Sequence, residues 1–167
     1  MVEVITQKII YKPVEDDLQS VIAEISAIAD KTPENALEQA ESLEAQLGHI
    51  LATPGKRIRP ALTLLASRLW GHHSSKLQVR MATAVELLHI ATLVHDDTVD
   101  HADTRRGHQT ASNLWGRNVA VLLGDFLFAT SAMYVCDTKN ISLVRRLAET
   151  KNKQEKGEVG DKQHRWQ

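Results

Sequence analysis

Apolar residues recur every three or four positions through much of this chain, the spacing that places them along one side of an α-helix. The first such stripe lies within residues 16–30, and its members are Leu18, Val21, Ile22, Ile25 and Ile28. A second helix is predicted to begin where Pro33 follows Thr32, because threonine caps helix starts and proline suits the first helical position. Its apolar positions continue to Ile50, and Pro54 predicts its end.

The rest of the chain predicts longer helices, because no proline occurs after Pro60. The apolar run 61–70 stops at Gly71, a residue type favoured just past helix ends. Residues 77–100 contain neither glycine nor proline and keep helical spacing, so the longest helix is expected there. After a polar loop, residues 112–135 predict a further helix, whose nearly all-apolar interior favours a central, buried position.

Together these segments predict an all-α fold. A short helix is expected over residues 141–148, and residues 151–167 form a strongly polar tail. No segment alternates apolar and polar residues as a half-buried strand would, and no internal repeat is found. With 167 residues, of which 43% are hydrophobic and 25% are charged, the chain has the composition of one globular domain.

The overall charge and the cysteine content argue against several classes of protein. Lysine and arginine number 20 against 21 acidic residues, so no basic field is available to hold nucleic acid. Cys136 is the single cysteine and no signal sequence is recognised, which together predict a cytoplasmic protein. The most apolar stretch, 119–129, contains Asp125 and is far shorter than the ~20 residues of a membrane span, so no transmembrane segment is expected.

Three aspartates gather at the end of the longest predicted helix. Asp96 and Asp100 are four residues apart and share one helix face, whereas Asp97 lies about 100° round the axis. Carboxylates are unfavourable at this end, where the helix dipole is negative, so a compensating positive charge is expected. Magnesium is one candidate, because it is held by one or two carboxylates together with phosphate oxygens. The alternative is an acidic helix end that forms salt bridges with the basic loop after it.

Two groups of cations and one histidine could face the same space as the aspartates. Arg105 and Arg106 offer planar, permanently charged forks that suit phosphate. Lys56 and Arg59 are three residues apart and could grip a second anion, while the alternative is a solvated basic turn between two helices. His89 lies two helical turns before the first aspartate, on the same face, and its alternative role is that of a core histidine.

Five separated motifs resemble those of the trans-prenyl diphosphate synthases, also called the polyprenyl synthetase family. In chain order they are Gly55-Lys56-Arg57-Ile58-Arg59-Pro60, Glu86-Leu87-Leu88-His89, Asp96-Asp97-Thr98-Val99-Asp100, Arg105-Arg106-Gly107 and Gly124-Asp125-Phe126-Leu127-Phe128-Ala129. The resemblance extends from the first helix to about Ala148 and is strongest to the medium- and long-chain synthases. It implies a helical bundle of the isoprenoid synthase type, with residues 1–150 as the N-terminal portion of a polyprenyl synthetase domain.

The resemblance also implies which residues carry the chemistry. In this family magnesium ions chelate an allylic diphosphate, whose departure leaves a carbocation that the double bond of isopentenyl diphosphate attacks. Asp96 and Asp100 would be direct magnesium ligands, with Asp97 as a third catalytic aspartate that assists them. Arg105 would hold the allylic diphosphate. Isopentenyl diphosphate would be bound by Lys56, Arg59, His89 and Arg106. Family members are commonly homodimers, so a homodimer, or association with a complete synthase, is expected.

Two small residues bear on the length of the product. Ala91 and Thr92 stand five and four residues before Asp96, where short-chain relatives carry bulky aromatics that close the cavity for the growing chain. Small residues there predict a product longer than farnesyl, and the alternative is simply close helix packing. Asp125 belongs to a Gly-Asp pair typical of the family and is expected to be a buried carboxylate with a structural partner.

The chain departs from the family pattern in two places. After Gly107 the family usually has a proline and then a histidine, where this chain has Gln109 and Ser112. The family's second aspartate-rich motif, which supplies the rest of the magnesium cage, is not found, and residues 151–156 are wholly polar where relatives continue as an apolar helix. These departures predict a truncated synthase with weak or no activity of its own.

Two other interpretations of function stay open. A non-catalytic partner subunit would dock onto a complete synthase through the exposed faces of an incomplete bundle. An HD-type metal phosphohydrolase is a weaker alternative, whose centre would use His95, Asp96, His72 or His73, and Asp125 or Asp137. This last interpretation leaves Asp97, Asp100 and the double arginine unexplained.

Overall fold

The computed structural model describes residues 10–30, 42–52, 55–71, 76–146, 148–150 and 152–153. In chain order its elements are η1 (Lys12–Val14), α2 (Glu15–Asp30), α3 (Leu43–Ala52), α4 (Ile58–Leu69), α5 (Lys76–Val99), β1 (Thr104–Arg105), β2 (His108–Gln109), α6 (Ala111–Trp115) and α7 (Arg117–Asp137). Residues 141–146 are also helical. Because each strand has only two residues, the prediction of an all-α fold is confirmed.

Most predicted helix boundaries agree with the structure. Helix α2 differs from its prediction by one residue at its start, and α5 by one residue at each end. Helix α4 begins at Ile58, ahead of the predicted apolar run, because Pro60 is tolerated within the first turn of a helix. The predicted start of the second helix at Thr32 and Pro33, and nearly all of the polar tail, lie outside the described residues.

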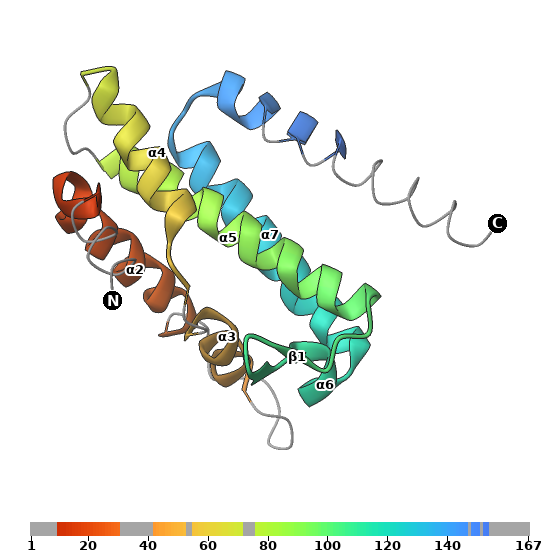
Figure 1. The fold of residues 1–167 in the computed structure, drawn as a ribbon. Helices are drawn as coiled ribbons and strands as arrows, with labels where there is room; N and C mark the ends of the chain where they lie inside the picture. The colour runs from red at the N-terminus through yellow and green to blue at the C-terminus, as the bar shows by residue number, and fades with distance from the viewer. Residues whose placement is uncertain are drawn as a thin grey trace.

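Helix α5 is the centre of the bundle. It packs against α2 and α4 on one side and against α6 and α7 on the other, and α7 follows it along most of its length (Figure 1). The prediction that residues 112–135 supply the central, buried helix is therefore wrong. Helix α7 buries Leu123 and Leu127 against α5, but Leu122 and Met133 on its opposite side are each 67% exposed. An almost wholly apolar sequence has no polar face to mark which side is covered, so periodicity could not assign it.

A glycine divides the predicted helix 112–135 into α6 and α7. Gly116 has φ 85° and ψ 161°, a conformation that is essentially restricted to glycine and that no helix contains. Helix α6 is capped by the Thr110 hydroxyl, which accepts a hydrogen bond from the Asn113 backbone N–H at 3.2 Å. The break lets the chain leave the hairpin, make one short helix and then run back along α5.

The loop between α5 and α6 contains a small antiparallel hairpin that the sequence did not predict. Thr104 pairs with Gln109 and Arg105 with His108, so the turn is made by Arg106 and Gly107. Both turn residues have positive φ, at 51° and 82°, which is the left-handed geometry that short hairpin turns require. The hairpin fixes the two adjacent arginines relative to the end of α5.

Helices α5 and α7 are each long and apolar enough to cross a membrane, judged by length and composition alone. Within the most apolar window, 56% of the residues of α5 and 33% of those of α7 are buried inside the bundle. The core helix of a globular protein passes the same test, so this is weak evidence for a membrane span. The expectation that no segment crosses a membrane stays a prediction.

Candidate functional site

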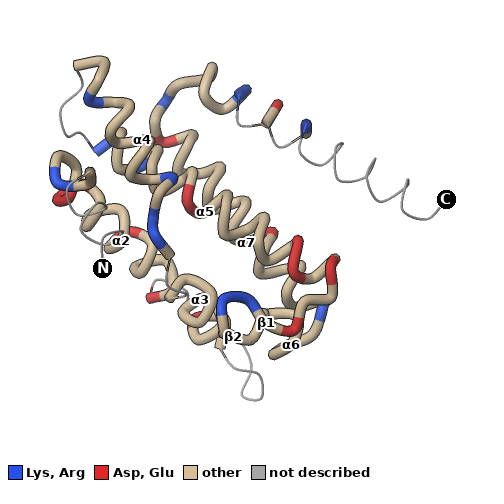
Figure 2. Tube along the Cα trace, in the orientation of Figure 1, with Lys and Arg blue, Asp and Glu red and all other residues tan. Residues whose placement is uncertain are grey.

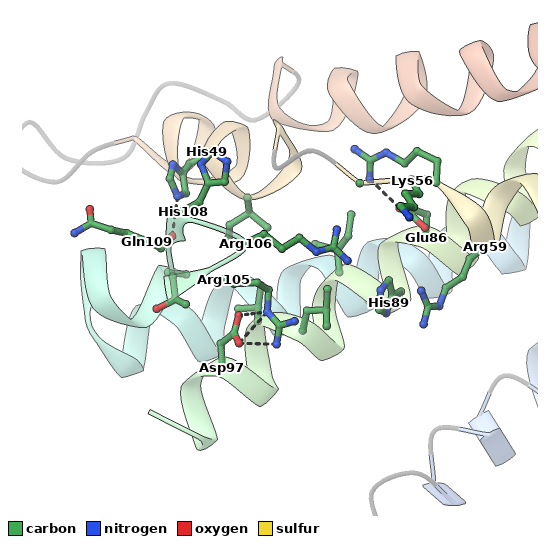
Figure 3. A pocket seen from close by; sticks show the side chains of 18 of the residues that line it. His49, Lys56, Arg59, Glu86, His89, Asp97, Arg105, Arg106, His108 and Gln109 are labelled. Atoms are coloured by element: carbon green, nitrogen blue, oxygen red, sulfur yellow. Dashed lines mark hydrogen bonds and ion pairs between the residues drawn. The ribbon is translucent and has the colours of Figure 1, made fainter. Parts of the chain in front are cut away.

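A pocket of about 640 Å³ lies between the loop before α4, the second half of α5 and the β1–β2 hairpin (Figure 3). All five residues predicted to bind diphosphate line it, and so does Asp97. The five are Lys56, Arg59, His89, Arg105 and Arg106. Figure 2 shows the basic segment before α4, the basic turn of the hairpin, and the acidic residues at the end of α5. Cations that come from three separate elements therefore meet in one space.

The loop before α4 is held in an uncommon backbone conformation. Arg57, the residue that precedes α4, has φ 49° and ψ 36°, in the left-handed region. Its Nη1 donates to Glu86 Oε1 of α5 at 2.8 Å, and its Nη2 donates to the Leu51 carbonyl oxygen at 3.3 Å. The Tyr11 hydroxyl donates to the Lys56 carbonyl oxygen at 3.2 Å. These hydrogen bonds connect the loop to Tyr11, which precedes η1, and to helices α3 and α5.

The hairpin places its two arginines in different positions. The Arg105 guanidinium grips Asp97 through three contacts, with Nε at 2.9 and 2.7 Å from the two carboxylate oxygens and Nη2 at 2.7 Å from Oδ1. Arg106 instead extends across the pocket towards Lys56 and His89 (Figure 3). Its Nη1 lies 3.3 Å from the point that a Cβ on Gly55 would occupy, so the glycine leaves the room that this side chain uses.

The electrostatics of the pocket favour a polyanion. Burial, followed by the nearby charge of Arg59, lowers the pKa of His89, and the arginines of the hairpin lower it further. Glu86 acts on the pKa of His89 in the opposite direction but does not offset the others. His89 is therefore neutral at pH 7 and can still donate a hydrogen bond, while the lysine and arginines supply the positive charge. Such a set of donors suits diphosphate oxygens.

The three predicted catalytic aspartates have different surroundings. Asp97 is buried and bound by Arg105, so for this residue the alternative of a salt bridge to the basic loop is what the structure contains. Asp96 is half-buried and Asp100 exposed, and neither lines the pocket. All three lie close enough to Arg105 to raise the pKa of its guanidinium, the hydrogen bond to Asp97 contributing most. Asp96 and Asp100 thus lie beside the cationic pocket rather than inside it.

The donor set at the end of α5 fits a hard divalent cation in part. Asp96 and Asp100 offer carboxylate oxygens one helical turn apart, which suits magnesium when phosphate oxygens and water complete its shell. Within the described ranges, no group of three or more His, Cys, Asp or Glu side chains is placed to hold a metal. A cation here would accordingly need oxygens from its ligand.

The two predicted chain-length residues lie away from the pocket. Ala91 and Thr92 are buried in α5, and the Thr92 hydroxyl donates to the His89 carbonyl oxygen at 2.8 Å. The apolar wall of the pocket is formed instead by other side chains: Ile50, Ile58, Ile90, Leu93, Val94 and Ala111. The role of Ala91 and Thr92 in product length stays a prediction.

Sequence reasoning missed one functional pair and misjudged another residue. Glu86 and Arg57 line the pocket as a bonded pair, although each belongs to a motif quoted for its neighbours. The sequence signal for this pair was Glu86, an acidic residue three positions before His89. A single acidic residue at such a position is ordinarily exposed to solvent. Asp125 was expected to be buried, but its side chain is 64% exposed and its oxygen lies 3.4 Å from His95 Nε2.

The structure does not assemble the centre that a phosphohydrolase of the HD type would need. Asp137 pairs with Arg80 at the other end of α7, with an Nη1 to Oδ2 distance of 2.9 Å. His95 contacts Asp125, and its Nε2 is also 3.2 Å from the Val121 carbonyl oxygen. His72 and His73 lie outside the described residues. Among the described residues considered for this centre, His95 of α5 thus contacts Asp125 of α7, while Asp137 pairs elsewhere, and no three of them form a group that could hold a metal.

Comparisons with known proteins agree with the geometry. A family model described as polyprenyl synthetase matches residues 40–167. A prenyl transferase from Synechocystis is 42% identical over 119 residues, which cover 70% of this chain and 37% of the relative. Octaprenyl diphosphate synthase from Haemophilus influenzae is 39% identical over 153 residues, which cover 87% of this chain and 46% of the relative.

Solved structures give the same answer. A decaprenyl diphosphate synthase from Rhodobacter capsulatus matches with a TM-score of 0.79 and 36% identity, over 92% of this chain and 45% of that one. A polyprenyl synthase from Caulobacter crescentus, complexed with calcium and isoprenyl diphosphate, matches with a TM-score of 0.79 and 34% identity, over 90% and 43%. The chain thus spans less than half the length of these relatives.

Proposed function

The chain belongs to the polyprenyl synthetase family, and we propose that it carries the diphosphate-binding portion of a trans-prenyltransferase. The reaction joins isopentenyl diphosphate to an allylic diphosphate and yields a longer polyprenyl diphosphate. One observation carries the proposal: Lys56, Arg59, Arg106 and the neutral His89 converge on one pocket from three elements. The lining contains five permanent cations, Lys56, Arg57, Arg59, Arg105 and Arg106, against two carboxylates, Glu86 and Asp97, and this excess of positive charge suits a polyanion.

In the proposed site the cations divide between two diphosphates. Lys56, Arg59, His89 and Arg106 face the interior of the pocket and bind isopentenyl diphosphate. Arg105 holds the allylic diphosphate from the other side, next to the aspartates. Its bond to Asp97 fixes the plane of the guanidinium, so the carboxylate assists by orienting the arginine. Asp97 would thus act on the anion through Arg105.

We propose magnesium as the metal, held by Asp96 and Asp100 together with oxygens of the allylic diphosphate. When bound, magnesium supplies Lewis acidity that helps the diphosphate group leave. Asp96 lies in the last turn of α5 and Asp100 directly follows the helix, with its backbone N–H donating to the Asp96 carbonyl oxygen at 2.8 Å, so both carboxylates lie close to Arg105 and would bring the diphosphate to it. The Caulobacter relative is complexed with calcium and isoprenyl diphosphate, which supports the proposal of a divalent cation and a diphosphate in this chain.

A second candidate function is that of a partner subunit. The chain spans less than half the length of the curated relatives it matches, and one of them, from Geobacillus stearothermophilus, is a heptaprenyl diphosphate synthase component 2 that is 38% identical over 143 residues. The exposed apolar side chains of α7, Leu122 and Met133, would suit association with another chain, either a second copy or a complete synthase. Activity that depends on an added synthase would distinguish this candidate.

The test combines turnover with binding. The purified chain is incubated with farnesyl diphosphate, labelled isopentenyl diphosphate and magnesium, and the extracted product is analysed for chain length. In parallel, calorimetry measures the magnesium-dependent affinity for inorganic pyrophosphate in Asp96→Ala and Asp100→Ala. Asp30→Ala is the matched control, because Asp30 is also an exposed acid at the C-terminal end of a helix.

We expect both variants at the end of α5 to lose magnesium-dependent affinity and the control to keep it. Labelled product would establish an independent enzyme, whereas binding without product would favour the partner subunit. Unchanged magnesium-dependent affinity in Asp96→Ala and Asp100→Ala would overturn the metal assignment. A folded wild-type chain that binds no pyrophosphate would overturn the proposed function.

A further inference from the structure

We propose that the Arg57–Glu86 ion pair positions the residues of the cationic pocket: it fixes residues 55–59, which form the loop before α4 and the first two residues of that helix, so that Lys56 and Arg59 face the bound anion. This inference rests on the proposed function, because it assumes that the anion in the pocket is a diphosphate. Arg57 and Glu86 act here through their neighbours. They are positioning residues.

The backbone of the loop would not adopt its conformation on its own. Arg57 has φ 49° and ψ 36°, a region that L-residues with long side chains rarely occupy. Such a conformation persists where surrounding contacts over-determine it. For Arg57 these contacts are the Glu86 carboxylate at 2.8 Å and the Leu51 carbonyl oxygen at 3.3 Å. The side chain of Arg57 therefore holds the strained backbone that directs its neighbours.

The ion pair is largely buried, and it therefore stabilises one position of the loop relative to α5. The exposed fractions of the two side chains are 16% for Arg57 and 7% for Glu86. A buried carboxylate is unfavourable unless it is paired, so the loop cannot move away from α5 without leaving Glu86 alone. An exposed pair would tolerate many loop positions, because its partners would be solvated in all of them.

The pair also links the loop to the histidine of the pocket. Glu86 precedes His89 by three residues on α5, so both side chains lie on one face of that helix. Lys56 and Arg59 flank Arg57 in the chain, and Figure 3 shows Arg59 beside His89. A single contact between the loop and α5 thereby sets the spacing of a lysine, an arginine and a histidine around one ligand.

The charge of Glu86 makes the direction of the change in anion affinity a test of this inference. A carboxylate that lines a cationic pocket repels an anion, so by Coulomb's law alone its removal should tighten anion binding. Positioning predicts the opposite, because a neutral amide at position 86 holds Arg57 by a weaker bond than the carboxylate does, and the loop is loosened. Glu86→Gln keeps the shape of the side chain and removes the charge, so the direction of the change in affinity separates the two effects.

The chain offers a matched control for loss of a structural ion pair. Arg68, in the last turn of α4, donates to Asp17 of α2, also at 2.8 Å, and the Asp17 side chain is likewise 7% exposed. Neither residue lines the pocket. Asp17→Asn should therefore lower the stability of the bundle much as Glu86→Gln does, without affecting residues 55–59.

The experiment measures inorganic pyrophosphate affinity by calorimetry at constant ionic strength for the wild-type chain, Glu86→Gln and Asp17→Asn. Circular dichroism verifies that each is folded. We expect Asp17→Asn to bind as the wild type does and Glu86→Gln to bind at least about fivefold more weakly, roughly the loss expected when one hydrogen bond to the ligand is weakened. Tighter binding by Glu86→Gln, or equal weakening in both variants, would overturn the proposal.

A second measurement does not depend on any ligand. Amide hydrogen exchange of the ligand-free chain should be faster at residues 55–59 in Glu86→Gln and unchanged there in Asp17→Asn. Unaltered exchange at these amides in Glu86→Gln would overturn the positioning role even if affinity fell. A wild-type chain that binds no pyrophosphate would contradict the proposed function, while the exchange result would still decide whether Glu86 orders the loop.

Discussion

The contact between Gly124 of α7 and His95 of α5 predicts an unusual double-mutant cycle. The His95 ring packs directly on the α7 backbone, and a Cβ added at Gly124 would overlap Nε2 and Cδ2 of that ring. His95 Nε2 also lies 3.2 Å from the Val121 carbonyl oxygen and 3.4 Å from an oxygen of Asp125. Gly124→Ala forces the ring to leave this position, and the two polar contacts are lost with it.

Two opposing contributions set the size of the effect. Overpacking of this kind costs about 1–3 kcal/mol. Alanine in place of glycine within a helix stabilises it by about 1 kcal/mol, because less backbone entropy is lost on folding. The difference predicts that Gly124→Ala lowers the free energy of unfolding by about 0–2 kcal/mol in the wild-type chain. In a His95→Ala background the steric cost disappears, so the same substitution should raise it by about 1 kcal/mol.

The assay is urea unfolding followed by circular dichroism for the wild type, both single variants and the double variant. The coupling between the two sites should be about 1–3 kcal/mol. Gly48→Ala is the control, because Gly48 lies within α3 with no neighbour in reach of an added Cβ, and it should stabilise the chain. An equal effect of Gly124→Ala in both backgrounds would refute the steric contact.

Three further predictions test other parts of the fold and site. Burial and nearby arginines lower the pKa of His89 in the folded chain, so protonation favours the unfolded chain. The free energy of unfolding of the wild type should therefore fall relative to that of His89→Gln as the pH drops through about 6.5. Parallel pH–stability curves from urea titrations of the two chains would contradict this. Gly116→Ala should cost about 1–3 kcal/mol, since φ 85° and ψ 161° exclude a Cβ, and a neutral urea midpoint would count against the assigned backbone. Ala91 is 1% exposed, so Ala91→Phe should lower the free energy of unfolding of this chain by about 1–3 kcal/mol. The same substitution in a complete version of the synthase should shorten the product, and an unchanged chain-length distribution would show that Ala91 does not control product length.

The helices were predictable because their signal is local. A repeat of three and four residues in the apolar positions is a property of the segment itself, and α2 and α5 begin and end within one residue of where it predicts. The break at Gly116 was missed because a single glycine within a predicted helix is also tolerated inside helices. The hairpin was missed because two-residue strands are too short to show alternation.

The membership of the pocket was largely predictable as well. Helical spacing placed His89 on the face of the aspartates, and the family motifs identified the four cations, all of which line the pocket. The pairing within the site was not predictable in the same way. That Asp97 is held by Arg105 depends on a hairpin of unpredicted shape, and that Glu86 meets Arg57 depends on the packing of the loop before α4 against α5.

The sequence by itself therefore determined the helical segments and the residue types that can bind diphosphate and metal, because both follow from side-chain chemistry and short-range spacing. The tertiary structure decided which of these residues face one another. It made α5 rather than α7 the centre of the bundle and left Asp125 exposed. Packing also joined Arg57 to Glu86, 29 residues away. Contacts between distant segments form only when the bundle brings their backbones together, since no local preference encodes them.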